Sequence, residues 1–295
     1  MDETKESTVR SDAVVSDAVI SGAVTAGAVP EGSAVGLRSG ADDGVRRLLS
    51  KVPQVSVYFW ITKVLTTGLG ETTSDSLVHQ YDPIIVVAAG GVAFAAALAL
   101  QFAVRRYVPW IYWLTVVMVS IFGTMVADVL HVGFGIPYAV STVFFTLVLV
   151  AVFVVWRKME KTLSFHSIHT WRREAFYWAA VVTTFALGTA AGDMTAVTLN
   201  LGYLPSGLLF VLAMAVPAIA YWRRWLGAIP AFWAAYILTR PVGASFADWL
   251  AVPAYRHGLD WGSGWVSLGL AAAILIFVSY LAMSRKDVET AVSAG

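Results

Sequence analysis

Long apolar runs constrain this chain more than any other feature. About 20 apolar residues in a helix are enough to cross the hydrocarbon core of a bilayer. Only 13% of the residues are charged, about half of the share in a soluble domain. The sequence therefore predicts an all-α polytopic membrane protein with eight transmembrane helices. The expected spans are 55–79, 83–104, 108–132, 136–156, 174–200, 204–222, 229–252 and 263–283.

The first 48 residues differ from the rest of the chain. They are rich in Ala, Val, Gly and Ser, contain no aromatic residue and begin with a mostly acidic stretch, unlike a signal peptide. This composition is typical of a disordered tail, which would be either inert or regulatory. We therefore expect a disordered cytoplasmic tail at 1–48, an eight-helix transmembrane domain at 49–286 and a short cytoplasmic tail at 287–295.

Basic residues predict the orientation in the membrane. Every even-numbered span ends in a pair of basic residues, whereas the opposite loops hold only Arg256. Because cytoplasmic loops are enriched in Lys and Arg, both termini are expected in the cytoplasm. Several tryptophans lie near the basic ends, where an interfacial belt would place them. They are Trp60, Trp110, Trp113, Trp156, Trp171, Trp178, Trp222 and Trp225.

A glycine followed five residues later by an aspartate occurs once in each odd-numbered span. The aspartates are 53, 65 and 55 residues apart, so one repeat consists of two spans and all repeats enter the membrane from the same side. This spacing predicts four parallel two-helix repeats around an axis along the membrane normal. The pairs are Gly70 and Asp75, Gly123 and Asp128, Gly188 and Asp193, and Gly243 and Asp248.

The odd spans also carry the other intramembrane polar groups, four residues apart on one helix face. A charge at the bilayer centre costs about 2.5–3.5 kcal/mol or more, so five carboxylates against two cations must hold protons, hold a cation or face water. The predicted cation ligands are Glu71, Asp75, Asp128, Asp193, Asp248 and His131. The predicted pathway or gating residues are Lys63, Thr67, Thr124, Thr189 and Arg240.

Each of these residues has a simpler interpretation. The aspartates follow the basic ends by about 20 residues, or about 30 Å of helix, so they could cap helix ends near the outer surface. The glycines could serve only close helix packing. Arg240 is interpreted first as an ion-pair partner of Glu71 or an aspartate, with a gate as the alternative. Pro241 predicts a kink, and His131 could be structural.

Other classes of protein find little support in the sequence. There is no cysteine, no phosphate-binding glycine loop, no helix with two His four residues apart and no convincing nucleophile beside a base. We therefore expect no enzyme and no required cofactor. The net charge of +1 gives no reason to expect a nucleic-acid partner.

Three segments resemble a bacterial family of uncharacterised multi-pass proteins described only as membrane-anchored. They are residues 52–67 with the following Gly70-Glu71-Thr72 and Asp75, Thr239-Arg240-Pro241-Val242-Gly243-Ala244 with Ala247-Asp248, and Gly258-Leu259-Asp260-Trp261-Gly262. The resemblance covers about residues 50–285. It implies an integral protein of the bacterial inner membrane and brings no assigned reaction.

The leading functional hypothesis is a transporter that exports a small cation in exchange for protons. Carboxylates and hydroxyls suit hard divalent metal ions, and manganese is the first choice because His131 and Met125 or Met194 lie near the aspartates. A cation or proton channel with a ring of four aspartates is the alternative. A non-transporting membrane sensor is the third hypothesis, and an enzyme acting on lipid is the least favoured.

Overall fold

The computed structural model describes residues 50–165 and 168–287. The expected tail at 1–48 and all but the first residue of the tail at 287–295 lie outside the described residues. Eight long α-helices make up the described chain, which contains no strand. The helices are α3 (Val57–Gln80), α4 (Pro83–Ala103), α5 (Pro109–Asp128), α6 (Tyr138–Glu160), α7 (Trp171–Asp193), α8 (Tyr203–Trp222), α9 (Ala228–Ala251) and α10 (Ser263–Ser284).

Six of the described helices are long and apolar enough to cross a membrane, and α3 and α9 are the two that fall short of that hydropathy. Both have 24 residues, which is long enough to span. Their lower hydropathy comes from polar side chains that are buried inside the bundle, including Lys63, Glu71 and Arg240. The all-helical, multi-pass membrane fold predicted from the sequence is therefore confirmed.

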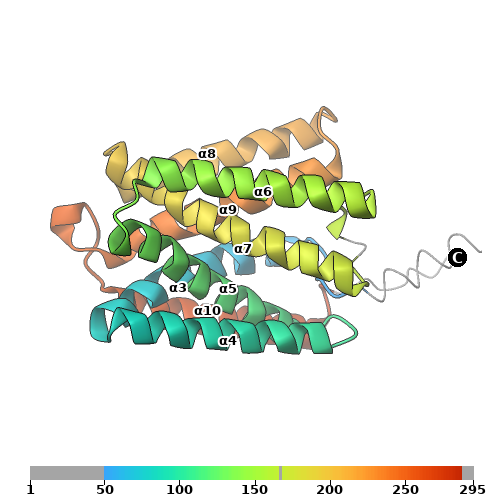
Figure 1. Cartoon of the computed structure of the whole chain (residues 1–295), viewed down its shortest axis with the longest axis horizontal. Helices are drawn as coiled ribbons and strands as arrows, with labels where there is room; N and C mark the ends of the chain where they lie inside the picture. Colours follow the sequence, from blue (N-terminus) through green and yellow to red (C-terminus); the bar gives the residue numbers. More distant parts are fainter. Residues whose placement is uncertain (1–49, 166–167, 288–295) are drawn as a thin grey trace, which may run out of the picture. The chain divides into compact units, whose positions relative to one another are not determined.

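The four odd helices form a closed inner ring. Helix α3 packs against α5, α5 against α7, α7 against α9, and α9 against α3. Figure 1 shows these helices between α4 and α10 on one side and α6 and α8 on the other. This arrangement gives the ring an approximate fourfold order, as four parallel two-helix repeats require.

Each even helix packs chiefly on the odd helix of the next repeat rather than on its own. Helix α4 lies on α5, α6 on α7 and α8 on α9, and α10 of the last repeat returns to α3 of the first. The even helices thus connect neighbouring repeats around the ring, and α10 closes the circle.

The repeated glycines lie where neighbouring inner helices touch. A Cβ atom added at Gly70 would overlap the Ser120 side chain of α5, and one added at Gly243 would overlap Thr67 of α3. At Gly123 it would lie 3.0 Å from the Cβ of Phe185 on α7. The glycine of α7 meets α9 in the same way, because a Cβ there would overlap the Arg240 side chain. The predicted close approach of the helices is confirmed at all four contacts.

Every odd helix carries a pair of aromatic residues near its amino-terminal end. The first of the pair lies 11 residues before the repeated glycine, and the second, always tryptophan, lies 10 residues before it. Several tryptophans, some in these pairs and some outside them, were expected in an interfacial belt. That assignment is wrong for Trp113, Trp178 and Trp156, which are buried, whereas Trp171 and Trp222 are exposed as a belt requires. The repeated pairs are Phe59-Trp60, Tyr112-Trp113, Tyr177-Trp178 and Phe232-Trp233.

These aromatic pairs pack into a layer across the end of the ring that carries the basic residues. The hydroxyls of Tyr112 and Tyr177 are 2.6 Å apart, and the ring centroids of Phe59 and Phe232 are 6.2 Å apart. All four of these side chains are buried. The layer therefore fills the inside of the ring at this end.

Candidate functional site

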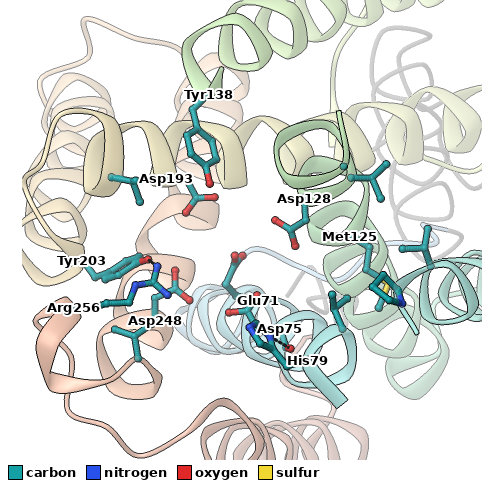
Figure 2. Close-up of a pocket in the computed structure, with 17 residues that line it drawn as sticks. Glu71, Asp75, His79, Met125, Asp128, Tyr138, Asp193, Tyr203, Asp248 and Arg256 are labelled. Carbon is teal, nitrogen blue, oxygen red and sulfur yellow. Dashed lines mark hydrogen bonds between the residues drawn. The ribbon is translucent and has the colours of Figure 1, made fainter. Parts of the chain in front are cut away.

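The five predicted carboxylates line one pocket at the opposite end of the ring. The pocket has a volume of about 530 Å³. Figure 2 shows the carboxylates around a common space, with the two tyrosines and the arginine that complete the polar lining. Its polar lining residues are Glu71, Asp75, His79, Asp128, Tyr138, Asp193, Tyr203, Asp248 and Arg256.

The carboxylates of the pocket all lie in the carboxyl-terminal halves of the inner helices. Asp128 is the last residue of α5 and Asp193 the last residue of α7. The negative ends of the helix dipoles therefore point toward the pocket and add to the potential of the carboxylates. Of the five carboxylates, Glu71 is neutralised by Arg240, and the four aspartates share the pocket with one lining arginine, Arg256, so the electrostatics of the site favour a positively charged ligand.

The aspartates differ in burial and in their partners. Asp248 is only 6% exposed, and its Oδ1 atom has no hydrogen-bond partner. Asp128 accepts a long hydrogen bond from the Ser74 hydroxyl, at 3.4 Å. Asp75 and Asp193 are half-buried in the pocket wall. The alternative that these aspartates merely cap helix ends at the outer surface is therefore not supported by their placement.

Arg240 does not itself line the pocket but pairs with Glu71, which does, and this network forms a floor beneath the pocket. Its Nη2 atom lies 2.6 Å from Glu71 Oε2 and 2.7 Å from Thr189 Oγ1, and it also donates to Thr124 Oγ1. The Nη1 atom donates to the main-chain carbonyl of Thr67 at 3.1 Å. One guanidinium from α9 thus binds α3, α5 and α7, and the expected ion pair with Glu71 is confirmed. Its three side-chain partners each directly follow the glycine of their own repeat.

Two of the predicted pathway residues lie below this floor. Lys63 is fully buried, has no hydrogen-bond partner for Nζ, and lies 3.9 Å from the ring centroid of Phe185 and 4.3 Å from that of Tyr236. Thr67 donates to the carbonyl of Val64 at 2.6 Å. Neither side chain lines the pocket, because Lys63 precedes Asp75 by about 18 Å along the helix.

His131 is not among the residues that line the pocket. Its Nδ1 atom lies 3.0 Å from the carbonyl oxygen of Ile136, and its ring centroid is 4.1 Å from that of Tyr138. In this structure it packs behind Tyr138, which itself faces the pocket. This placement agrees with the structural interpretation of His131 rather than with a ligand.

Two inner helices change to π-helix directly after their aspartates. The turns η1 (Val129–Gly133) and η3 (Met194–Thr198) follow Asp128 and Asp193, respectively. A wider turn of this kind is frequent at functional sites. Repeats two and three thus share a local geometry that repeats one and four lack, and the fourfold order of the pocket is only approximate. Helix α9, in contrast, continues through Pro241 as one α-helix.

Sequence analysis missed four polar residues of the lining. His79 lies in the last turn of α3, at the end of the expected first span, and was not among the predicted site residues. Tyr138 and Tyr203 begin even helices, whereas all predicted site residues came from odd spans. Arg256 donates to the hydroxyl of Tyr203 and stacks on its ring at 5.4 Å. The one signal that could have indicated Arg256 was its position as the only basic residue on the acidic side.

The carboxylates surround the pocket without gathering at one point. Within the described residues, no group of three His, Asp or Glu side chains is close enough to hold a metal ion. Metal ions such as Mn²⁺ and Mg²⁺ need several ligand atoms at about 2 Å. The predicted metal ligands therefore share one pocket, but this conformation does not bring them into a coordination sphere.

The fold and pocket define a multi-pass membrane protein built from internal repeats around an acidic pocket. Four segments of the chain, 58–107, 111–162, 176–225 and 231–287, match one protein family, described as a repeat of unknown function (DUF347). The matches cover more than half of the chain, so this protein belongs to the DUF347 repeat family. Each match contains one odd helix and the even helix after it. No curated protein and no solved structure matches the chain.

Proposed function

We propose that this protein is a transporter that exchanges a small cation for protons, with the acidic pocket as the binding site. The observation that carries the proposal is the convergence of five carboxylates, on four different helices, on one pocket of about 530 Å³. Glu71 is paired with Arg240, and the four aspartates, which have no such ion pair, must hold protons or a cation where they are shielded from water. Protons and the cation therefore compete for the same oxygen atoms, which is the coupling that an exchanger needs.

The floor below the pocket supports a carrier rather than a channel. The Arg240 network and the aromatic layer fill the ring beneath the pocket, so a cation in the pocket meets two barriers before the basic end. The Oδ1 atom of Asp248, which has no partner, argues against a sensor whose carboxylates are all paired. We propose the bacterial inner membrane as the location, with both termini in the cytoplasm and the pocket open to the outside.

Manganese is the metal that the sequence favours, because carboxylate and hydroxyl oxygens are its ligands and Met125 also lines the pocket. At least three carboxylates would have to move closer together to coordinate it. A metal substrate therefore requires a second conformation in which the inner helices contract around the ion.

Proteoliposomes with a trapped pH-sensitive dye test the proposed exchange. With the native chain, we expect an added cation to drive proton movement across the membrane. Each of the single variants Asp193→Asn and Asp248→Asn should lose this movement. The matched control is Asp260→Asn, because Asp260 is exposed, lies outside the pocket and has a φ of 60°, which asparagine also adopts. Undiminished movement in both pocket variants would refute the proposal.

A further inference from the structure

The size of the pocket does not match a single metal ion. A metal site needs ligand oxygens at about 2.0–2.6 Å from one point, whereas these carboxylates form no such group among the described residues. Pockets of about 300–1,000 Å³ are typical of small-molecule sites, and this one has about 530 Å³. The available space therefore fits an organic ligand.

The pocket is lined by apolar as well as acidic side chains. The apolar lining residues include Val87 of α4, Met125 of α5, Val197 after α7 and Val252 after α9. Apolar walls gain free energy by covering methylene groups. Carboxylates on different helices that do not gather at one point, in a pocket with apolar lining residues, match a ligand whose charges are separated by a hydrocarbon chain.

An unpartnered acceptor indicates which kind of cation fits. Asp248 lines the pocket and is 94% buried, and its Oδ1 atom has no hydrogen-bond donor. A buried acceptor left without a donor is costly. A primary ammonium group has three N–H donors and can satisfy it, whereas a quaternary ammonium group has none. The rings of Tyr138 and Tyr203 at the same pocket can also stabilise an ammonium group through their faces.

We propose that the ligand of this pocket is a linear organic cation that carries two or more primary or secondary ammonium groups, that is, a diamine or polyamine. One ammonium group binds Asp248, and the others bind carboxylates on neighbouring helices, with the methylene chain against the valines and Met125. Arg256 lies at the same pocket as a fixed positive charge, so it limits how much additional positive charge the pocket accepts. This inference rests on the proposed function, because it names the substrate class of the same site.

Calorimetric binding to the purified full chain in detergent tests the inference, with spermidine, putrescine, 1-aminobutane, tetraethylammonium and Mn²⁺ as probes. We expect spermidine and putrescine to bind at least tenfold more tightly than 1-aminobutane, and tetraethylammonium to bind more weakly still. Asp248→Asn and Asp193→Asn, which keep the side-chain volume, should each weaken spermidine binding tenfold or more. Asp260→Asn should leave binding unchanged.

The outcomes separate this inference from the transport proposal. The polyamine ligand would be overturned if Mn²⁺ binds tightly, Asp248→Asn abolishes that binding, and neither spermidine nor putrescine binds. The proposal of cation transport would still stand. Equal affinity for putrescine and 1-aminobutane would also overturn it, because the second charge would then play no part. If no probe binds and none drives proton movement in proteoliposomes, the transport proposal itself fails. Chromatographic homogeneity of both variants ensures that lost binding reports the pocket rather than misfolding.

Discussion

Replacing Gly243 with alanine tests the close packing of the inner ring. The added Cβ atom would overlap the Thr67 hydroxyl and lie 2.6 Å from the carbonyl oxygen of Val64. The hydroxyl can rotate away, but the carbonyl belongs to the backbone of α3 and can move only with its helix. The α3–α9 contact must therefore open, which also stretches the hydrogen bond from Arg240 to the Thr67 carbonyl.

The size of the effect follows from two opposing terms. Overpacking a tight contact costs about 1–3 kcal/mol, and a backbone obstacle places this case near the upper value. Alanine regains about 1 kcal/mol over glycine through helix propensity. The net loss is then about 2 kcal/mol, which corresponds to a decrease in Tm of about 4–8 °C for a domain of this size.

The assay is thermal unfolding of purified variants in detergent, followed by tryptophan fluorescence. Gly269→Ala is the matched control, because Gly269 lies within α10 and a Cβ there would meet no heavy atom within 4 Å. We expect that variant to keep or slightly raise the Tm. The Tm of Gly123→Ala should lie between those of Gly243→Ala and Gly269→Ala, since its Cβ would lie 3.0 Å from the Cβ of Phe185. A Gly243→Ala protein as stable as Gly269→Ala would refute the close-packed ring.

Three further predictions concern buried charges. Arg240→Met should cost about 3–5 kcal/mol because it leaves Glu71 buried without its partner, and adding Glu71→Gln should restore part of the lost Tm. Lys63→Met should leave the Tm unchanged or raise it. The substitution loses cation–π contacts worth about 2 kcal/mol, but it also removes the cost of burying an unpaired charge, which is several kcal/mol. A decrease in the free energy of unfolding of more than about 2 kcal/mol would contradict this. Burial raises the pKa of Asp287, which accepts a hydrogen bond from Tyr107. The folded state therefore binds the extra proton above about pH 4, and stability falls as the pH rises through the folded-state pKa. In denaturant titrations, the free energy of unfolding of Asp287→Asn relative to that of the native chain should increase with pH. A difference that does not change with pH would contradict the reasoning.

Sequence periodicity was sufficient to predict the helices, the repeats and the acidic cluster. Hydropathy marks each span because a bilayer imposes its thickness on the helix, and the glycine-to-aspartate spacing revealed which spans are equivalent. The pairing of Arg240 with Glu71 was predictable as well, because a lone buried guanidinium requires a counter-ion. These features depend on one helix at a time or on elementary charge balance.

The remaining features depend on how helices meet, which periodicity does not contain. The packing of each even helix on the next repeat is a tertiary choice, and it brings Tyr138 and Tyr203 to the pocket from helices without an ionisable core residue. The buried tryptophans were misassigned because position along the span gives depth but not the direction that a side chain faces. Counting back from each glycine would have revealed the four aromatic–Trp pairs and corrected the assignment of Trp113 and Trp178.

Proton release on cation binding tests the central claim most directly. Spermidine and, separately, Mn²⁺ are added to the purified full chain in weakly buffered detergent solution with a pH indicator. If the carboxylates hold either protons or the cation, the cation that binds should release about one proton or more per protein. The release should be lost in Asp193→Asn and Asp248→Asn and retained in Asp260→Asn. Cation binding that releases no proton, or release that both pocket variants retain, would contradict the exchange of cation for protons in this pocket.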